Sequence, residues 1–221
     1  MIRVYFWRIE KKWVLWAISR MALDRISLWR TPGISFWKLL GTGKGETFTP
    51  RDADAQRWGL LIVIDPNELS KFEDSALLKR WSAKATSEYV VELSPISIHG
   101  EWSGKKPFAY PSNIPANWQG KVVAITRARI KWRKNLIFWR SVPPVTKSLH
   151  NSPGLTAAIG IGEAPIGLQG TFSVWESGEA VRNFAYRGEA HKEAIAATHR
   201  ENWYAEEMFA RFAVTKEVGS L

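Results

Sequence analysis

The chain contains no cysteine, and it has only four histidines among its 221 residues. The absence of cysteine excludes disulfides, iron–sulfur clusters, thiolate-ligated haem and covalent Cys-x-x-Cys-His haem attachment. A tightly bound transition metal or haem iron would therefore depend on few nitrogen ligands, which are His99, His150, His191 and His199.

Long apolar runs are absent as well. The longest aliphatic run, residues 60–64, is far shorter than a membrane-spanning helix, and the first residues lack the apolar stretch of a signal peptide. We therefore expect a cytoplasmic protein. Its basic surface leaves membrane association open, because cationic side chains are attracted to anionic lipid.

Positive charge and tryptophan are both in excess. The net charge is +10, but lysine and arginine are spread along the chain without a recognition motif, so we expect no nucleic-acid partner. A solvated basic surface is the simpler interpretation of this charge. The 13 tryptophans indicate either an unusually aromatic core or an apolar pocket for a large flat ligand.

Two parts of the chain resemble each other. Residues 28–43 and 149–162 both run from a leucine through Pro-Gly and an apolar stretch to Gly-x-Gly. Near the start of each half, VYFWRI and VAITRA place Arg8 and Arg127 119 positions apart (127 minus 8). The shared order of these features predicts an internal duplication.

Hydrophobic periodicity predicts the order strand-helix-strand-strand-helix-strand in each half. This is the ferredoxin-like unit, and its repetition predicts an α+β fold of two tandem ferredoxin-like repeats. The expected strands are 4–9, 34–40, 59–65 and 88–93, then 122–130, 155–161, 171–176 and 208–214; the expected helices are 15–29, 67–84, 141–150 and 179–199. We place the first repeat at 1–99, a proline-containing linker at 100–120 and the second repeat at 121–221.

His191 is the histidine best placed to bind iron. It shares a predicted helical face with Ala194, Ile195 and Thr198, and a neutral imidazole on an apolar face is a good haem ligand. A buried histidine that hydrogen-bonds to a carbonyl would produce the same pattern. His199 lies eight residues further on, roughly 12 Å along the helix, and we interpret it as part of a solvated helix end.

Other charged residues allow more than one interpretation. Arg127 and Arg129 alternate on a predicted strand and so share one face. If that face is internal, they need anionic partners such as haem propionates or a polar distal group; if it is external, they are ordinary surface charges. Of Glu206 and Glu207, we expect one to pair with Arg211 and the other to face water.

Several longer segments resemble a known family. FWKLLGTGKGETFTP, HGEWSGKKPF, AITRARI, IGIGEAPIGLQGTFSVW and the block 191–212 are similar, in the same order, to the spheroidene monooxygenase family. The resemblance implies a dimeric α/β-barrel-type fold, formed here within one chain by the two repeats. It also implies a haem-containing oxygenase, since the named members of the family oxidise carotenoids.

The resemblance also assigns roles to residues. His191 matches the helix histidine of the family and becomes the expected metal ligand of a b-type haem. The remaining expected site residues are Arg127, Ser173 and Gln169 as catalytic groups, and Phe184, Ile195, Trp203 and Arg129 as cofactor-binding groups. The expected partners are a small hydrophobic substrate and an electron donor, and the family leaves room for an oligomer.

Two alternatives to a monooxygenase remain open. A haem-dependent dehydratase, or another non-oxidative haem enzyme of the same fold, would need a distal acid but no oxidant. A haem carrier or sensor would need no catalytic group at all.

Overall fold

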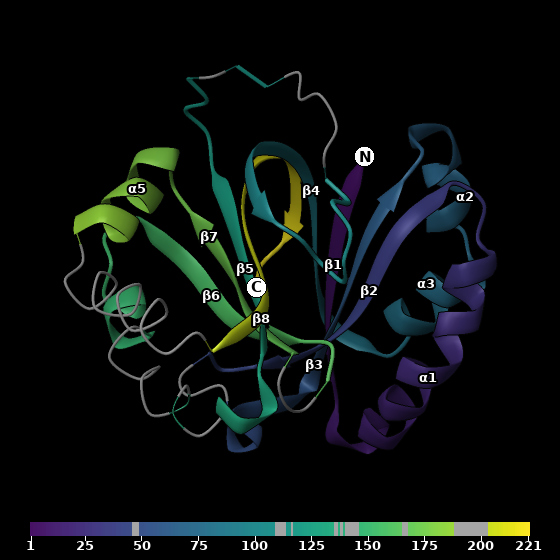
Figure 1. Ribbon diagram of the computed structural model, residues 1–221. Coiled ribbons are helices and arrows are strands. Elements are labelled where there is room, and N and C mark those ends of the chain that lie inside the picture. Colours follow the sequence, from purple (N-terminus) through teal and green to yellow (C-terminus); the bar gives the residue numbers. More distant parts are fainter. Residues whose placement is uncertain are drawn as a thin grey trace.

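A closed barrel of eight antiparallel strands forms the centre of the protein in a computed structural model (Figure 1). The structure describes residues 1–45, 49–108, 114–115, 117–134, 137, 139, 146–164, 168–187 and 203–221. The strand order around the barrel is β1-β3-β2-β6-β7-β5-β8-β4. Helices α1, α2 and α3 cover the barrel on one side and α5 covers it on the other.

Each half of the chain contributes one four-stranded part of the barrel. The first half consists of β1 (Ile2–Ile9), α1 (Val14–Arg30), β2 (Ile34–Gly43), β3 (Ala53–Ile64), α2 (Leu69–Glu73), α3 (Ala76–Ser82) and β4 (Ala85–Gly100). The second half consists of β5 (Val122–Ile130), the helical residues 146–150, β6 (Leu155–Gly162), β7 (Leu168–Trp175), α5 (Gly178–Arg187) and β8 (Tyr204–Gly219). The predicted ferredoxin-like repeats and their barrel are thereby confirmed.

The two halves join edge to edge at two places. At one joint, β2 pairs with β6 and Thr42 lies opposite Ile161, which are 119 positions apart (161 minus 42). At the other joint, β4 pairs with β8 and Ser94 lies opposite Ala213, again 119 positions apart (213 minus 94). The same interval separates Arg8 from Arg127, so both joints place duplicated positions opposite each other, as an approximate twofold axis requires.

The Gly-x-Gly segments form the first of these joints. Gly41 lies opposite Gly162, and Gly43 lies opposite Gly160. Both segments are thus the ends of paired strands. A Cβ atom on Gly162 would lie 2.9 Å from the carbonyl oxygen of Leu168, so a side chain there would force the backbone apart.

The described side chains inside the barrel form one packed core. Aromatic rings from several strands meet there: Phe6 contacts Phe172 with ring centroids 5.0 Å apart, and Phe108 contacts Phe212 at 5.2 Å. All four side chains are buried. The described part of the chain therefore leaves no room for a large ligand within this core, and the sheet–helix interfaces are the better candidates.

The segment after β4 belongs to this core. Trp102 and Phe108 are fully buried and contact each other with ring centroids 6.3 Å apart. Trp102 also contacts Phe36 of β2. Residues 100–108, which we assigned to a linker, thus fold back and contribute side chains to one end of the barrel.

The predicted helix 67–84 is divided into two short helices. Helix α2 ends at Glu73, and Ser75 begins the next helix by accepting a hydrogen bond from the backbone N–H of Leu78. A serine in this position is a typical helix N-cap, so the break has a local cause. Among the described residues, the structure has no helix that is both long and apolar enough to cross a membrane.

Candidate functional site

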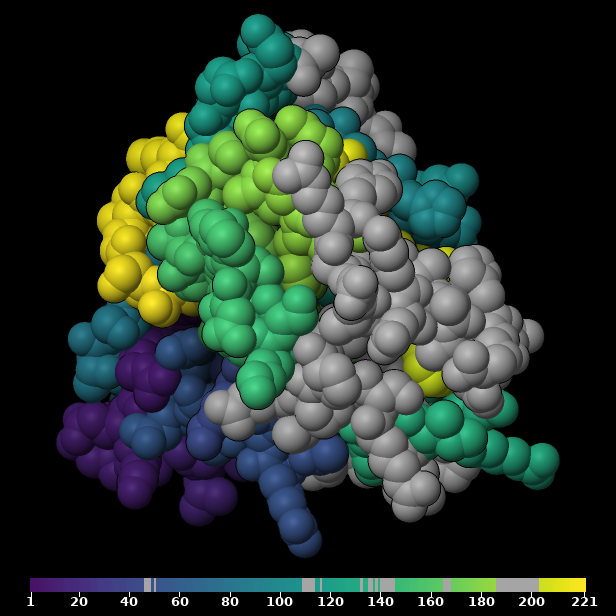
Figure 2. Space-filling model, turned by 90° about the vertical axis from the view of Figure 1, so that its left-hand side faces the viewer, coloured from purple at the N-terminus to yellow at the C-terminus, as the bar shows by residue number. Residues whose placement is uncertain are grey.

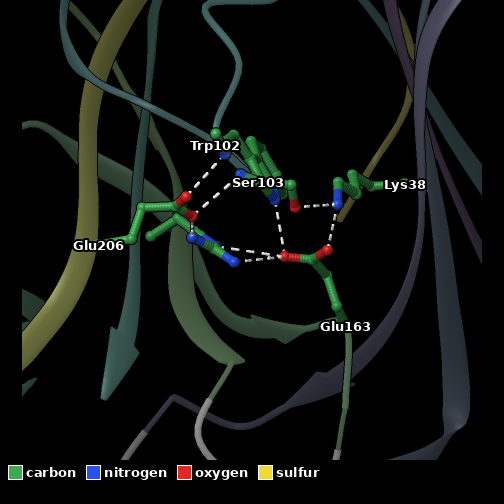
Figure 3. Close-up of polar contacts among 7 residues, drawn as sticks. Lys38, Trp102, Ser103, Glu163 and Glu206 are labelled. Atoms are coloured by element: carbon green, nitrogen blue, oxygen red, sulfur yellow. Dashed lines mark hydrogen bonds and ion pairs between the residues drawn. The ribbon is translucent and has the colours of Figure 1, made fainter. Parts of the chain in front are cut away.

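A buried cluster of charges lies at one end of the barrel, where Figure 3 shows Lys38, Glu163 and Glu206 pointing toward one another. Arg127 is at its centre, because it pairs with both carboxylates. Its side chain is only 4% exposed and points into the barrel from β5. The guanidinium contacts two carboxylates: Nη2 lies 3.1 Å from Glu163 Oε1, and Nη1 forms a close ion pair with Glu206. The internal alternative for this strand face is therefore correct, and the anionic partners come from the protein itself.

Glu163 follows β6 and accepts hydrogen bonds from three different segments. Arg127 Nε donates to it at 3.2 Å, Trp102 Nε1 donates at 2.7 Å, and Lys38 of β2 forms a close ion pair with its second oxygen. Lys38 also donates to Ser103 Oγ at 2.6 Å. The carboxylate therefore links β2, β5 and the segment 102–104 across the β2–β6 joint.

Glu206 of β8 closes the other side of the cluster. Besides Arg127, it accepts hydrogen bonds from the backbone N–H groups of Ser103 at 2.9 Å and Gly104 at 2.7 Å. Our expectation that Glu206 or Glu207 pairs with Arg211 is wrong, because Arg211 instead donates to Ser97 Oγ of the neighbouring strand β4. The arrangement compensates charge, since two cations face two carboxylates in a site that excludes most water.

For both Arg127 and Glu163, burial and ion pairing shift the pKa in opposite directions. Burial lowers the pKa of Arg127, although the neighbouring Glu163 works against this shift. Burial alone would raise the pKa of Glu163, but hydrogen bonds and charges from Lys38, Trp102 and Arg127 hold its pKa below the ordinary value. Glu163 is therefore ionised at neutral pH and is a poor proton donor.

Ser173 and Gln169 lie on the opposite face of the same sheet. In the register of β5 and β7, Ser173 is paired with Ala124 and Gln169 with Ala128, whereas Arg127 is paired with Gly170. Both residues are buried and face away from the barrel interior. Ser173 Oγ accepts a hydrogen bond from Trp175 Nε1 at 2.9 Å and donates to the carbonyl of Ala124 at 3.2 Å. The structure thus separates Arg127 from the other two predicted catalytic residues.

This helix-facing surface differs sharply between the two halves. In the first half, large side chains fill the interface between the sheet and helices α1, α2 and α3. In the second half, six of the corresponding positions carry small or polar ones, whereas Trp175, the counterpart of Ile62, is large. The pairs, first half before second half, are Tyr5 and Ala124, Trp7 and Thr126, Ile9 and Ala128, Leu39 and Ala158, Trp58 and Thr171, and Leu60 and Ser173. We call the second set the small-residue face.

The loss of volume on the small-residue face is large. An aromatic side chain such as Trp7 or Tyr5 typically buries roughly 150–250 Å² of surface, and alanine or threonine at the equivalent position covers far less. Thr126, Ala124 and Ala158 are half-buried. An apolar surface of this width, with the hydroxyl groups of threonine and serine on it, is suited to a flat ligand held between sheet and helices.

Helix α5 and the helical residues 146–150 cover one end of this face. The two segments lie side by side in Figure 2. Leu149 and Val181 belong to one buried cluster with Trp175. Phe184 of α5 packs against Trp175 with ring centroids 5.5 Å apart.

Trp203 is buried at the other end of β5, where its carbonyl accepts a hydrogen bond from the N–H of Lys131. Phe184 and Trp203 thus lie near opposite ends of the small-residue face.

A polar cavity opens where the two halves meet. Its volume is about 580 Å³, and it borders the small-residue face at Ala158. Arg8 and Arg57 line it, and Arg8 forms an ion pair with Asp54 at 2.9 Å. Burial lowers the pKa of Arg57, and the nearby charge of Arg8 lowers it further.

The remaining predicted residues have different outcomes. His191, Ile195 and His199 lie outside the described residues, so their placement stays a prediction. Arg129 shares the face of Arg127, as predicted, but it is exposed at the barrel end. Among the described residues, no group of three or more acidic or histidine side chains could hold a metal ion. A haem held by one histidine does not need such a group.

No protein-family model matches the chain. A protein of Rhodobacter capsulatus named spheroidene monooxygenase is 36% identical over 207 residues, which cover 93% of this chain and 86% of that protein. A protein of the same name from Cereibacter sphaeroides is 34% identical over 217 residues, covering 97% of this chain. The chain spans 65% of the length of this second relative.

Solved structures show the same fold at low sequence identity. A crystal structure of an aldoxime dehydratase is similar with a TM-score of 0.62 and 9% identity, covering 99% of this chain and 82% of that one. The aldoxime dehydratase OxdRE, in complex with butyraldoxime, is similar with a TM-score of 0.61 and 10% identity, covering 96% and 78%. At this identity the likeness concerns the fold alone.

Proposed function

Because the chain belongs to the spheroidene monooxygenase family, we propose that it is a monooxygenase that oxidises a carotenoid-like hydrophobic substrate. We propose further that a b-type haem binds on the small-residue face and that His191 is its iron ligand. The name of the relatives supports the reaction and the substrate class. The haem and its position rest on the residues of this chain.

The contrast between the two helix-facing surfaces is the observation that carries the haem proposal. Tyr5, Trp7 and Leu60 fill this interface in the first half, so no large ligand fits there. Their counterparts Ala124, Thr126 and Ser173 are much smaller, which supports a place for one in the second half. The large side chains are missing from this interface in one half only. A cofactor bound there would explain this difference between the two repeats.

The donor set fits a haem with a single protein ligand. The chain has no thiolate, and His191 belongs to the predicted helix 179–199, whose described part, α5, packs against the second-half sheet. We propose that Phe184, Trp203 and Ile195 form the walls of the pocket, with Arg129 at its open end. The bound iron would supply oxygen activation, and the apolar walls would exclude water from it.

Ser173 and Gln169 are the proposed polar groups beside the cofactor. Both lie on the sheet face that would meet it, and the Ser173 hydroxyl is held in one orientation by Trp175 and Ala124. Arg127 lies behind this face with its charge neutralised by Glu163 and Glu206. We propose that Arg127 acts as a positioning residue that holds β5 against its neighbours.

Visible spectroscopy tests the cofactor proposal. The purified wild type, titrated with haem, should develop a Soret band with one equivalent bound. His191→Ala should lose the band or shift it strongly, whereas the matched control His199→Ala should behave as the wild type. A wild type without a Soret band, or an unchanged band in His191→Ala, would contradict the proposal.

Turnover conditions test the reaction. A monooxygenase should convert a carotenoid only when oxygen and a reductant, or a peroxide, are supplied, and the product should gain one oxygen atom by mass spectrometry. Turnover without any oxidant would favour a dehydratase instead. Haem binding without substrate-dependent change under any of these conditions would favour a carrier or sensor.

A further inference from the structure

Helix α1 exposes an unusual amount of apolar surface. Leu15 and Trp29 are 81% and 78% exposed, and Ile18, Leu23 and Ile26 are each at least half exposed. These five residues are half of the ten large hydrophobic side chains that are exposed in the described part of the chain. Single exposed apolar residues are ordinary, but their concentration on one helix marks a contact surface.

Four of these residues, together with Ala22, form one stripe along the helix. Leu15, Ile18, Ala22, Ile26 and Trp29 follow each other at intervals of three or four residues, which places them on one face. All five are exposed. The stripe is about 21 Å long, from the rise of 1.5 Å per residue over fourteen residues.

The opposite face of α1 is already occupied by the protein. Ala17, Asp24 and Leu28 are buried against the first-half sheet and α3. Asp24 is inaccessible to solvent and accepts hydrogen bonds from Arg20 Nε at 3.0 Å and from Trp81 Nε1 at 2.9 Å. These contacts fix the orientation of the helix, so the apolar stripe stays on the outer surface of the protein.

Cations flank the stripe and exposed acids are absent from the helix. Arg25 and Arg30 are exposed on α1, and Lys11 and Lys12 are exposed in the 3₁₀ turn before it. The only acidic residue of α1 is Asp24, which is fully buried. Glu10, before the turn, is paired with Lys12 at 2.9 Å.

From this combination we propose that α1 is a docking surface for an anionic lipid membrane. The apolar stripe would enter the boundary between headgroups and acyl chains, and the flanking arginines and lysines would contact the phosphates. A second copy of this chain fits less well, because a twofold contact through this helix would bring its cations against the same cations. A groove on another protein would need a matching acidic rim.

The proposed membrane surface is independent of the proposed cofactor pocket. Helix α1 covers the first-half sheet, on the opposite side of the barrel from α5 (Figure 1). Substitutions on its outer face therefore leave the small-residue face unchanged. Lipid binding and haem binding can each be lost without the other, so failure of one proposal does not count against the other.

Vesicle sedimentation of the full chain tests the proposal. The wild type should bind vesicles of phosphatidylcholine with phosphatidylglycerol much more tightly than vesicles of phosphatidylcholine alone. The double variant Leu15→Gln, Trp29→Gln should bind at least about 100-fold more weakly, as expected when two large side chains no longer leave water. The control Ile96→Gln, Val218→Gln changes two exposed apolar residues outside α1 and should bind as the wild type.

Two further measurements test the role of charge and the alternative of self-association. Arg25→Gln with Arg30→Gln should weaken binding to the phosphatidylglycerol vesicles by roughly fivefold for each charge, and added salt should do the same. No binding of the wild type to these vesicles, or equal losses in the Ile96 and Val218 control, would overturn the proposal. A wild-type dimer in analytical ultracentrifugation that the Leu15 and Trp29 variant converts to monomer, without lipid binding, would assign the stripe to self-association instead.

Discussion

Replacing Glu163 by glutamine should destabilise the protein although the side chain keeps its shape. Glu163 is 13% exposed and accepts hydrogen bonds from Arg127 Nε at 3.2 Å and Trp102 Nε1 at 2.7 Å, beside its ion pair with Lys38. Glutamine would remove one of the two negative charges from the cluster. Arg127 would keep Glu206 as its remaining carboxylate, whereas Lys38 would lose its ion-pair partner.

The magnitude follows from the burial of the cluster. Removing one partner of a buried ion pair costs about 3–5 kcal/mol, and the lower end applies here because Arg127 keeps Glu206. For a chain of this size, about 3 kcal/mol corresponds to a fall in melting temperature of roughly 6–12 °C. Urea denaturation and calorimetry measure both quantities. The control Glu176→Gln changes an exposed carboxylate and should stay within about 0.5 kcal/mol of the wild type.

The pH dependence gives the same prediction a second readout. Burial raises the pKa of Glu163, but its donors outweigh burial and hold the folded pKa below the ordinary value. The stabilisation is therefore fully present above the unfolded carboxyl pKa of about 4.3 and is lost as the pH falls through the lower folded value. The difference between wild type and Glu163→Gln should shrink in acid. A variant as stable as the wild type at neutral pH would refute the reasoning.

Three further changes have defined outcomes. Thr126→Trp, which restores the residue type of Trp7, should abolish the Soret band in a haem titration while far-UV circular dichroism stays unchanged; full haem binding would exclude this face as the site. Asp24→Asn should lower the free energy of unfolding by about 3 kcal/mol in urea, because its charged acceptor for two arginines is lost; a change below about 1 kcal/mol would contradict this. Gly170→Ala should destabilise by more than about 2 kcal/mol in the same assay, since its Cβ would lie 2.1 Å from the carbonyl oxygen of Thr126; a neutral effect would mean that β5 and β7 separate easily.

The repeated architecture was predictable because periodicity is a local property. Arg8 and Arg127, and the Gly-x-Gly segments of both halves, keep the same interval in sequence and occupy equivalent places in the barrel. The division between α2 and α3 also had a local signal, the serine at position 75, which a search for helix caps would have found.

The charged cluster was not predictable, because its partners come from four separate segments. Arg127 and Glu163 are 36 positions apart, and Arg127 and Glu206 are 79 apart. Alternation showed that Arg127 and Arg129 share a face, but it does not show which face is internal. Trp102, in a segment that we assigned to a linker for its prolines, carries no sequence signal for its place in the core.

The small-residue face could have been predicted, and we missed it. The alignment of VYFWRI with VAITRA already places Ala124 at the position of Tyr5 and Thr126 at the position of Trp7. We used this alignment to detect the duplication but did not compare the sizes of the aligned residues. In a duplicated chain, such a difference in size at equivalent positions indicates where one half has acquired a ligand site.

The two joints between the halves have a consequence for how the chain reaches its folded state. Strands β2 and β4 are the edges of the first-half sheet, and each finds its neighbour, β6 or β8, only in the second half. A first half that folds alone, as it emerges from the ribosome, presents two unpaired strand edges, which are ready templates for another chain. Two first halves can therefore close a barrel with each other, so a truncated chain is expected to form a homodimer through these edges or to aggregate.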